Sequence, residues 1–120
     1  MKRLTKLEDL FLGLLAFYLF LALPVAWWWF FVLILVPDVS MVGYLFGPGT
    51  GALVYNLVHH RAVTIGLYIL GGIFGLPWVQ AAALIGFAHS SFDRALGYGL
   101  KYGDSFQHTH LGMIGRAARD

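Results

Sequence analysis

The chain contains no cysteine, which excludes disulfide bonds and thiolate metal sites. Any metal would therefore be held by nitrogen or oxygen ligands from His, Asp, Glu, Asn or the backbone. Charged residues are also scarce, because they make up only 12% of the 120 residues, whereas soluble proteins average roughly 25%. Hydrophobic residues make up 59% of the chain, so this composition predicts a single-domain integral membrane protein.

Missing motifs and missing charge disfavour further classes of activity. The chain has no glycine-rich phosphate-binding loop, no dinucleotide-binding glycine pattern and no G-x-S-x-G. Its five histidines are too few for the clustered boxes of membrane di-iron hydroxylases and desaturases. The net charge of +2 comes from basic residues beside apolar stretches, where they set membrane topology. Nucleic acid is therefore not an expected partner.

The chain does contain a series of long apolar stretches separated by turn residues. Pro24, the run GPGTG at 47–51 and the run GLP at 75–77 mark the turns. A helix needs about 20 mainly apolar residues to cross a bilayer, and each stretch is close to that length. We therefore predict an all-α, four-helix integral membrane bundle whose second span is kinked at Pro37. The predicted spans are 7–23, 25–46, 51–74 and 77–99, followed by a cytoplasmic tail, 100–120.

The basic residues predict the orientation of this bundle. Six of the eight Lys and Arg residues lie at its two ends, and the turns between spans 1 and 2 and between spans 3 and 4 contain none. Both termini are therefore expected in the cytoplasm, which fits an even number of crossings. The basic residues at the two ends are Lys2, Arg3, Lys6, Lys101, Arg116 and Arg119.

Five polar residues fall at similar depth within the predicted spans. His89 and Asp93 are four residues apart and share one helix face, while Asn56 lies three residues before His59. At about 1.5 Å per residue, these four and Asp38 all fall in the cytoplasmic half of the bilayer. Ionisable groups at such depth are unfavourable and commonly mark a functional site. We therefore expect the five residues to share one site.

These side chains offer a set of nitrogen and oxygen ligands that suits zinc, manganese or iron. We expect Asp38, His59, His89 and Asp93 to bind one divalent metal, and His110 of the tail to complete the site. A metal-bound hydroxide there could hydrolyse an ester or phosphoester of a membrane lipid. Asp38, His89 and Asp93 would be the catalytic residues. The residues expected to contact the substrate are Asn56 and, through an anionic group, Arg94 and Lys101.

Two other functions remain open. His89 and Asp93 could form a proton relay in a small oligomeric transporter, proton carrier or channel. They could instead be a neutralised pair that fixes the helices of a structural or accessory subunit. Asp38 could act only as a helix cap after Pro37. Membrane lipid is the expected partner of an enzyme, and a second copy of the chain is the expected partner in a transporter.

Two segments resemble the signature of a known family. They are PDVSMVGYLFGPGTGALVYNLVH at 37–59 and HSSFDRALGYGLKYGDSFQHTHLGMIGR at 89–116. They are similar to an uncharacterised family of small bacterial four-span membrane proteins, known only as a domain of unknown function. The resemblance implies a bacterial inner membrane location, and it places Asp38, Asn56, His59, His89 and Asp93 in the family pattern. It implies no reaction. A looser similarity, in residue types alone, relates the chain to small bacterial membrane proteins described as metal-dependent hydrolases.

Overall fold

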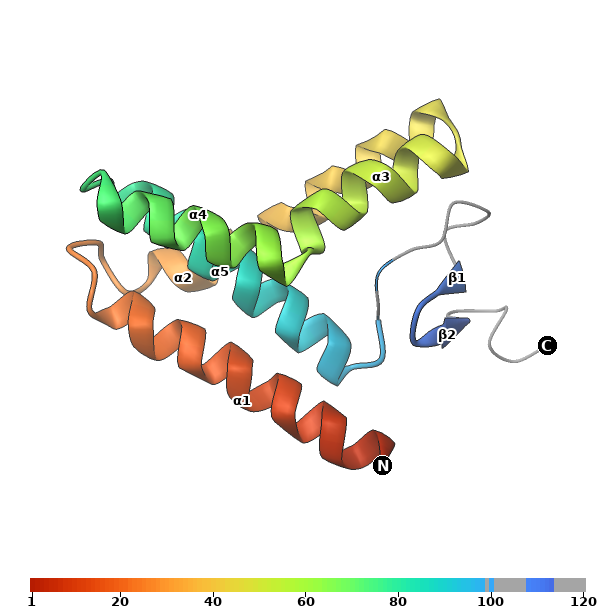
Figure 1. Ribbon diagram of the computed structural model, residues 1–120, viewed down its shortest axis with the longest axis horizontal. Coiled ribbons are helices and arrows are strands. Elements are labelled where there is room, and N and C mark those ends of the chain that lie inside the picture. The colour runs from red at the N-terminus through yellow and green to blue at the C-terminus, as the bar shows by residue number, and fades with distance from the viewer. Residues whose placement is uncertain (99, 101–107, 114–120) are drawn as a thin grey trace.

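The computed structural model describes residues 1–98, 100 and 108–113, and over these residues the chain is almost entirely helical. Within that part it forms five α-helices, one 3₁₀ helix and two strands of two residues each (Figure 1). The all-α class predicted from sequence is therefore confirmed. The helices are α1 (Lys2–Leu21), α2 (Trp29–Leu33), the 3₁₀ helix η1 (Val36–Phe46), α3 (Pro48–His59), α4 (Arg61–Ile73) and α5 (Pro77–Ala95). The strands β1 (His108–Thr109) and β2 (Gly112–Met113) pair antiparallel.

Helix α5 lies at the centre of the bundle, with α1 packed on one side and α4 on the other (Figure 1). Small residues on α5 and α1 allow this close approach. The ring of Phe92 lies over Gly13 of α1, where an added Cβ atom would be 2.5 Å from its Cε1. Any larger residue at position 13 would therefore have to displace the Phe92 ring or move α1 away from α5.

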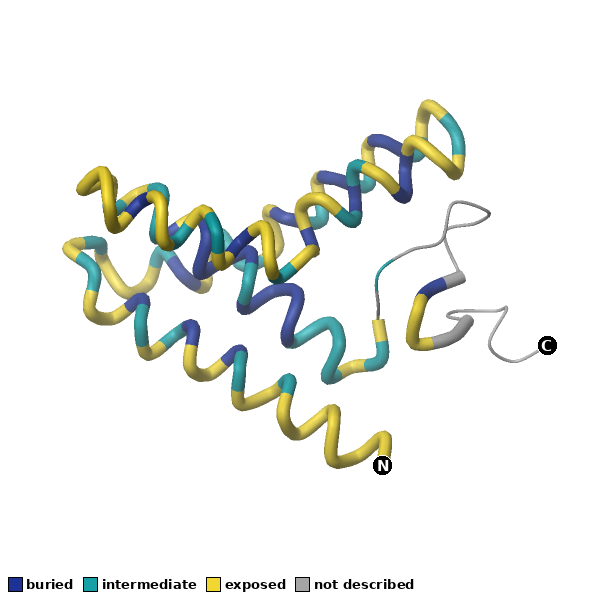
Figure 2. The backbone as a smooth tube through the Cα atoms, in the orientation of Figure 1, coloured by how far each residue is buried: buried dark blue, intermediate teal, exposed yellow. Residues whose placement is uncertain are grey.

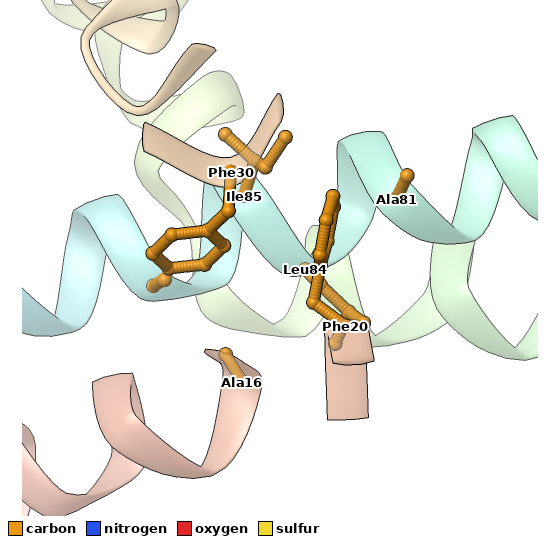
Figure 3. Close-up of a cluster of buried hydrophobic side chains, with 7 residues drawn as sticks. Ala16, Phe20, Phe30, Ala81, Leu84 and Ile85 are labelled. Carbon is orange, nitrogen blue, oxygen red and sulfur yellow. The ribbon is translucent and has the colours of Figure 1, made fainter. Parts of the chain in front are cut away.

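The hydrophobic core lies where α1, α2 and α5 meet. Phe20 of α1 and Phe30 of α2 are buried there with their rings 5.5 Å apart, edge to face (Figure 3). Opposite them lie Leu84 and Ile85 of α5. Edge-to-face aromatic pairs add to the stabilisation that comes from burying apolar area. This cluster fixes α2 against α5 and so determines where the following residues, 34–38, meet α5.

Helices η1 and α3 form a second packed pair that projects from the rest of the bundle (Figure 1). The turn between them is made at Gly47, whose φ of +112° is a backbone conformation that only glycine adopts readily. The ring of Tyr44 then packs directly over Gly51, where no side chain could fit. The pair folds back on itself, and the end of α3 returns to α5 at His59.

The single helix predicted over 51–74 is not formed, because the chain breaks at His60. This residue adopts an extended conformation, with φ of −80° and ψ of 120°, so that α3 ends before it and α4 begins after it. The His60 ring caps the new helix, because its Nδ1 atom accepts a hydrogen bond from the backbone N–H of Ala62 at 3.2 Å. The His60 side chain thus stabilises the start of α4 inside an otherwise apolar stretch.

The kinked helix predicted over 25–46 is instead two helices, a short α-helix followed by a 3₁₀ helix. Helix α2 ends at Leu33, and Pro37 is the second residue of η1. Because proline has no backbone N–H, the α-helical hydrogen-bond pattern cannot continue through it.

Among the described helices, one continuous stretch is long and apolar enough to cross a membrane. It runs from Trp29 to Phe46, covers 18 residues and has a mean hydropathy of 1.9. Length and composition thus support one crossing, which is weak support for a membrane location. The four-span arrangement stays a prediction. Many positions on the outer faces of the helices are exposed (Figure 2).

Candidate metal centre

Four of the five predicted ligands converge from three separate elements. Asp38 comes from η1, His59 from the last residue of α3, and His89 and Asp93 from α5. One nitrogen or oxygen atom from each lies within 4.8 Å of all the others. This arrangement could hold a metal ion.

The distances within this cluster match the spacing of ligands around a single small ion. His89 Nε2 lies 2.9 Å from Asp38 Oδ1 and 3.1 Å from Asp93 Oδ2. His59 Nε2 lies 3.6 Å and 3.7 Å from the same two oxygen atoms. Ligands bound to a tetrahedral zinc ion at 2.0–2.1 Å are about 3.3 Å from one another. Four of the six pairs of atoms are therefore close to this spacing, and the other two pairs lie within 4.8 Å.

Both histidine rings are oriented by backbone carbonyl groups. His59 Nδ1 donates to the carbonyl oxygen of Tyr55 at 2.9 Å, and His89 Nδ1 donates to that of Ile34. A carbonyl can only accept, so each Nδ1 carries a proton and each ring turns its Nε2 toward the two carboxylates. His89 Nε2 hydrogen-bonds to Asp38 Oδ1, and a metal would take the place of the proton in that contact. Metal-binding histidines are commonly held in this way by a carbonyl on the opposite ring nitrogen.

The carbonyl of Ile34 is available to His89 because of the proline that follows. In a 3₁₀ helix it would accept from residue 37, but Pro37 has no N–H. In an α-helix it would accept from Asp38, whose N–H instead bonds to the carbonyl of Leu35 at 3.1 Å. The Pro37-Asp38 pair therefore supplies one candidate ligand directly and orients a second through the carbonyl group it leaves free.

His59 is the most enclosed member of the cluster. Its side chain is 3% exposed, and its ring stacks on that of Tyr55 with centroids 3.8 Å apart and planes within 9°. Its Nε2 atom is buried and has no hydrogen-bond partner among the described residues. A buried nitrogen without a partner is unfavourable, so a positively charged ligand between His59 and the carboxylates would satisfy it.

Charge in the cluster also favours a cation. With both imidazoles neutral, as metal binding requires, the two ionised carboxylates would give a local charge of −2, and a divalent cation would neutralise it. The side chains of Asp38 and Asp93 are 38% and 21% exposed, whereas those of the two histidines are nearly buried. The open side of the cluster is therefore the side of Asp38.

The structure separates His110 from the other four predicted ligands. Its Nδ1 atom accepts a hydrogen bond from the backbone N–H of Leu100 at 2.7 Å, which ties the ring to a neighbouring segment. The ring lines a different cavity, beside Arg94. Partial burial and the nearby charge of Arg94 lower the pKa of His110, so its ring is neutral at neutral pH.

The three predicted substrate-binding residues lie in different places. Arg94 lies beside the cluster, along a narrow crevice that His59 and Asp93 also line. Asn56 does not join it, because it lines a separate surface pocket of about 380 Å³ with His60. Lys101 lies outside the described residues.

Sequence reasoning missed two residues at the cluster. Tyr55 is 2% exposed and provides both the stacking ring and the carbonyl for His59. Its position four residues before His59 was the available signal, because that spacing gives one helix face. Ser90 lines the crevice beside Asp93, and its buried Oγ has no hydrogen-bond partner within the described residues. Nothing in the sequence distinguishes it from Ser91.

The fold and the cluster together define a helical protein with a half-buried His/Asp site that could hold a metal. The chain belongs to the family described as domain of unknown function (DUF4260), which it matches over residues 2–114. The resemblance to an uncharacterised family is therefore confirmed. No curated protein and no solved structure matches the chain.

Proposed function

We propose that this protein is a metal-dependent membrane enzyme, a hydrolase that cleaves an ester or phosphoester of a lipid at the cytoplasmic leaflet. The observation that carries the proposal is the convergence of two imidazole Nε2 atoms and two carboxylates, all within 4.8 Å of one another. Because both Nδ1 atoms donate to backbone carbonyls, both Nε2 atoms are turned toward the two carboxylates. A divalent cation would stabilise that arrangement.

Exposed apolar side chains support the membrane part of the proposal. Leu45 and Phe46 of η1 are 80% and 79% exposed, and Ile73 and Phe74 at the end of α4 are each 69% exposed. Such groups are poorly solvated in water, whereas lipid tails would cover them. In this proposal both termini lie in the cytoplasm and four segments cross the inner membrane.

The donor set supports a metal of catalytic use. Histidine and carboxylate ligands suit zinc first, with manganese and iron as alternatives. When bound, such an ion supplies an activated water and polarises the bond to be cleaved. Asp38 is the most exposed of the four residues, so substrate would enter on its side. His89 and Asp93 would then hold the ion from α5, and Arg94 would hold an anionic group of the substrate.

Metal analysis is the first test of this proposal. Protein purified without a histidine tag and supplied with zinc is expected to contain about one metal ion per chain by mass spectrometry. His59→Ala and His89→Ala should both lose it, because each removes one converging nitrogen. His60→Asn is the matched control, since asparagine keeps the cap on α4 and the position adjoins His59. Metal retained equally in all four proteins would rule out this site.

Hydrolysis is the second test. Metal-loaded protein in detergent is offered short-chain phospholipids, and released fatty acid and released phosphate are measured separately. We expect activity that depends on added metal and falls by about 100-fold or more in Asp93→Ala, with His60→Asn unchanged. Product release that is the same with and without a chelator would contradict the enzyme proposal.

A proton relay is the second candidate, because His89 Nε2 lies within hydrogen-bond distance of both Asp38 and Asp93. A proton on that nitrogen could be shared between the two carboxylates. This candidate predicts no bound metal after zinc supplementation and a proton flux across liposomes that Asp93→Asn abolishes.

A further inference from the structure

A second polar cavity lies at one end of the bundle, apart from the His/Asp cluster. It has a volume of about 370 Å³ and lies where α1 and α4 begin and α5 ends. Four basic side chains line it, together with two acidic ones. They are Lys2, Lys6, Arg61 and Arg94, with Glu8 and Asp9. Residues far apart in the sequence thus give this cavity a net positive charge.

Only one of the basic groups is neutralised in the part of the chain that the structure describes. Arg61 donates from its terminal NH1 nitrogen to Asp9 Oδ1 at 2.7 Å, and both side chains are largely buried. This ion pair holds α4 against α1 and fixes the guanidinium group at the wall of the cavity. Arg94 lies close enough to feel the charges of both Arg61 and Asp9. The guanidinium groups of Arg61 and Arg94 therefore both lie at the cavity, and the carboxylate of Asp9 interacts with both of them.

Further features of the cavity suit an anion. His110 accepts an N–H from Leu100 on its Nδ1, so its neutral ring carries the remaining proton on Nε2 and can donate it. Gly97 has a φ of +97°, and the Lys6 ammonium nitrogen lies 3.9 Å from where a Cβ of that residue would be. The ammonium group therefore lies beside the backbone at position 97. The cavity lining combines two guanidinium groups, two ammonium groups and a neutral donor.

We infer that this cavity binds the phosphate group of a membrane lipid or of a soluble phosphate ester. Planar guanidinium groups bind phosphate through paired hydrogen bonds, and several cations around one small space favour phosphate over a neutral headgroup. Arg94 lines both this cavity and the crevice beside His59 and Asp93. The inference rests on the proposed function in one respect: it takes the substrate of the hydrolase to be a molecule that carries phosphate. Binding itself does not require the metal.

Calorimetric titration of the full chain in detergent tests the inference. The probes are inorganic phosphate, dioctanoyl phosphatidic acid and, for the acyl chains alone, dioctanoylglycerol. We expect phosphatidic acid to bind at least tenfold more tightly than dioctanoylglycerol. Lys6→Gln and Arg61→Gln should each weaken phosphate binding about tenfold, because each removes one charge that faces the anion. Arg3→Gln is the matched control on the same helix, because Arg3 does not line the cavity, and it should leave affinity unchanged.

Asp9→Asn separates a binding site from a merely structural ion pair. It removes a negative charge and releases Arg61, so phosphate should bind more tightly, while a structural role predicts only a lower Tm with no gain in affinity. Equal affinity for inorganic phosphate and phosphatidic acid would identify a soluble phosphate ester as the ligand, and tighter lipid binding would identify a headgroup. Absence of binding, or binding that Lys6→Gln and Arg61→Gln leave unchanged, would overturn the inference.

The metal content of each variant keeps this result distinct from the metal proposal. Loss of phosphate binding with about one metal retained per chain would locate the effect in the cavity. Phosphate binding by a parent protein that takes up no metal after zinc supplementation would uphold the cavity and reject the metal-dependent hydrolase.

Discussion

Removal of the metal with a chelator is expected to lower the Tm of the purified protein by about 15 °C or more. A ligand present at 1,000 times its Kd stabilises the folded state by about 4 kcal/mol, and each kcal/mol shifts the Tm of a small domain by about 4–8 °C. The effect should be large here because the candidate ligands come from η1, α3 and α5. Helix α3 packs mainly on η1 and only lightly on α5. A bound ion would therefore be the main connection between the η1–α3 pair and the rest of the bundle.

The control for this measurement is the same chelator treatment of His89→Ala. That variant should start at a lower Tm, because two carboxylates lose a buried partner, and the chelator should then change nothing. Addition of zinc should restore the stripped parent but not the variant. An equal drop in Tm for parent and variant would mean that the chelator acts elsewhere, and the cluster would be only a structural His/Asp pair.

The cluster itself could be predicted from sequence because helix periodicity carries the information. His89 and Asp93 differ by about 40° around a helix, so they share a face wherever α5 lies. Placing Asp38 and His59 beside them required only the order and direction of the segments. The agreement concerns position alone, and metal binding by these residues remains a proposal.

The orientation of the other polar residues depends on local backbone detail. Asn56 is rotated by about 60° from His59 and Tyr55 by only about 40°, so the tyrosine rather than the asparagine faces the cluster. His60 breaks an apolar stretch because its own ring caps the next helix. His110 is held by a hydrogen bond to Leu100, ten residues away. No periodic pattern encodes such contacts.

Replacement of Asp38 by cysteine is expected to change which metal the protein selects. The chain has no cysteine of its own, so any thiolate signal must come from the introduced residue. A thiolate sulfur lies closer to Cβ than a carboxylate oxygen does, and the longer zinc–sulfur bond of about 2.3 Å partly compensates for the difference. A thiolate also prefers zinc over manganese, so the preference should rise on the order of 100-fold. Cobalt(II) loaded into Asp38→Cys should also show a sulfur-to-cobalt charge-transfer absorption that is absent from the parent.

Ser40→Cys is the matched control, because Ser40 is buried in the same helix, η1, but is not in the cluster. A charge-transfer band of equal strength in both variants would indicate adventitious binding. Cobalt bound by Asp38→Cys without that band would show that residue 38 does not contact the metal.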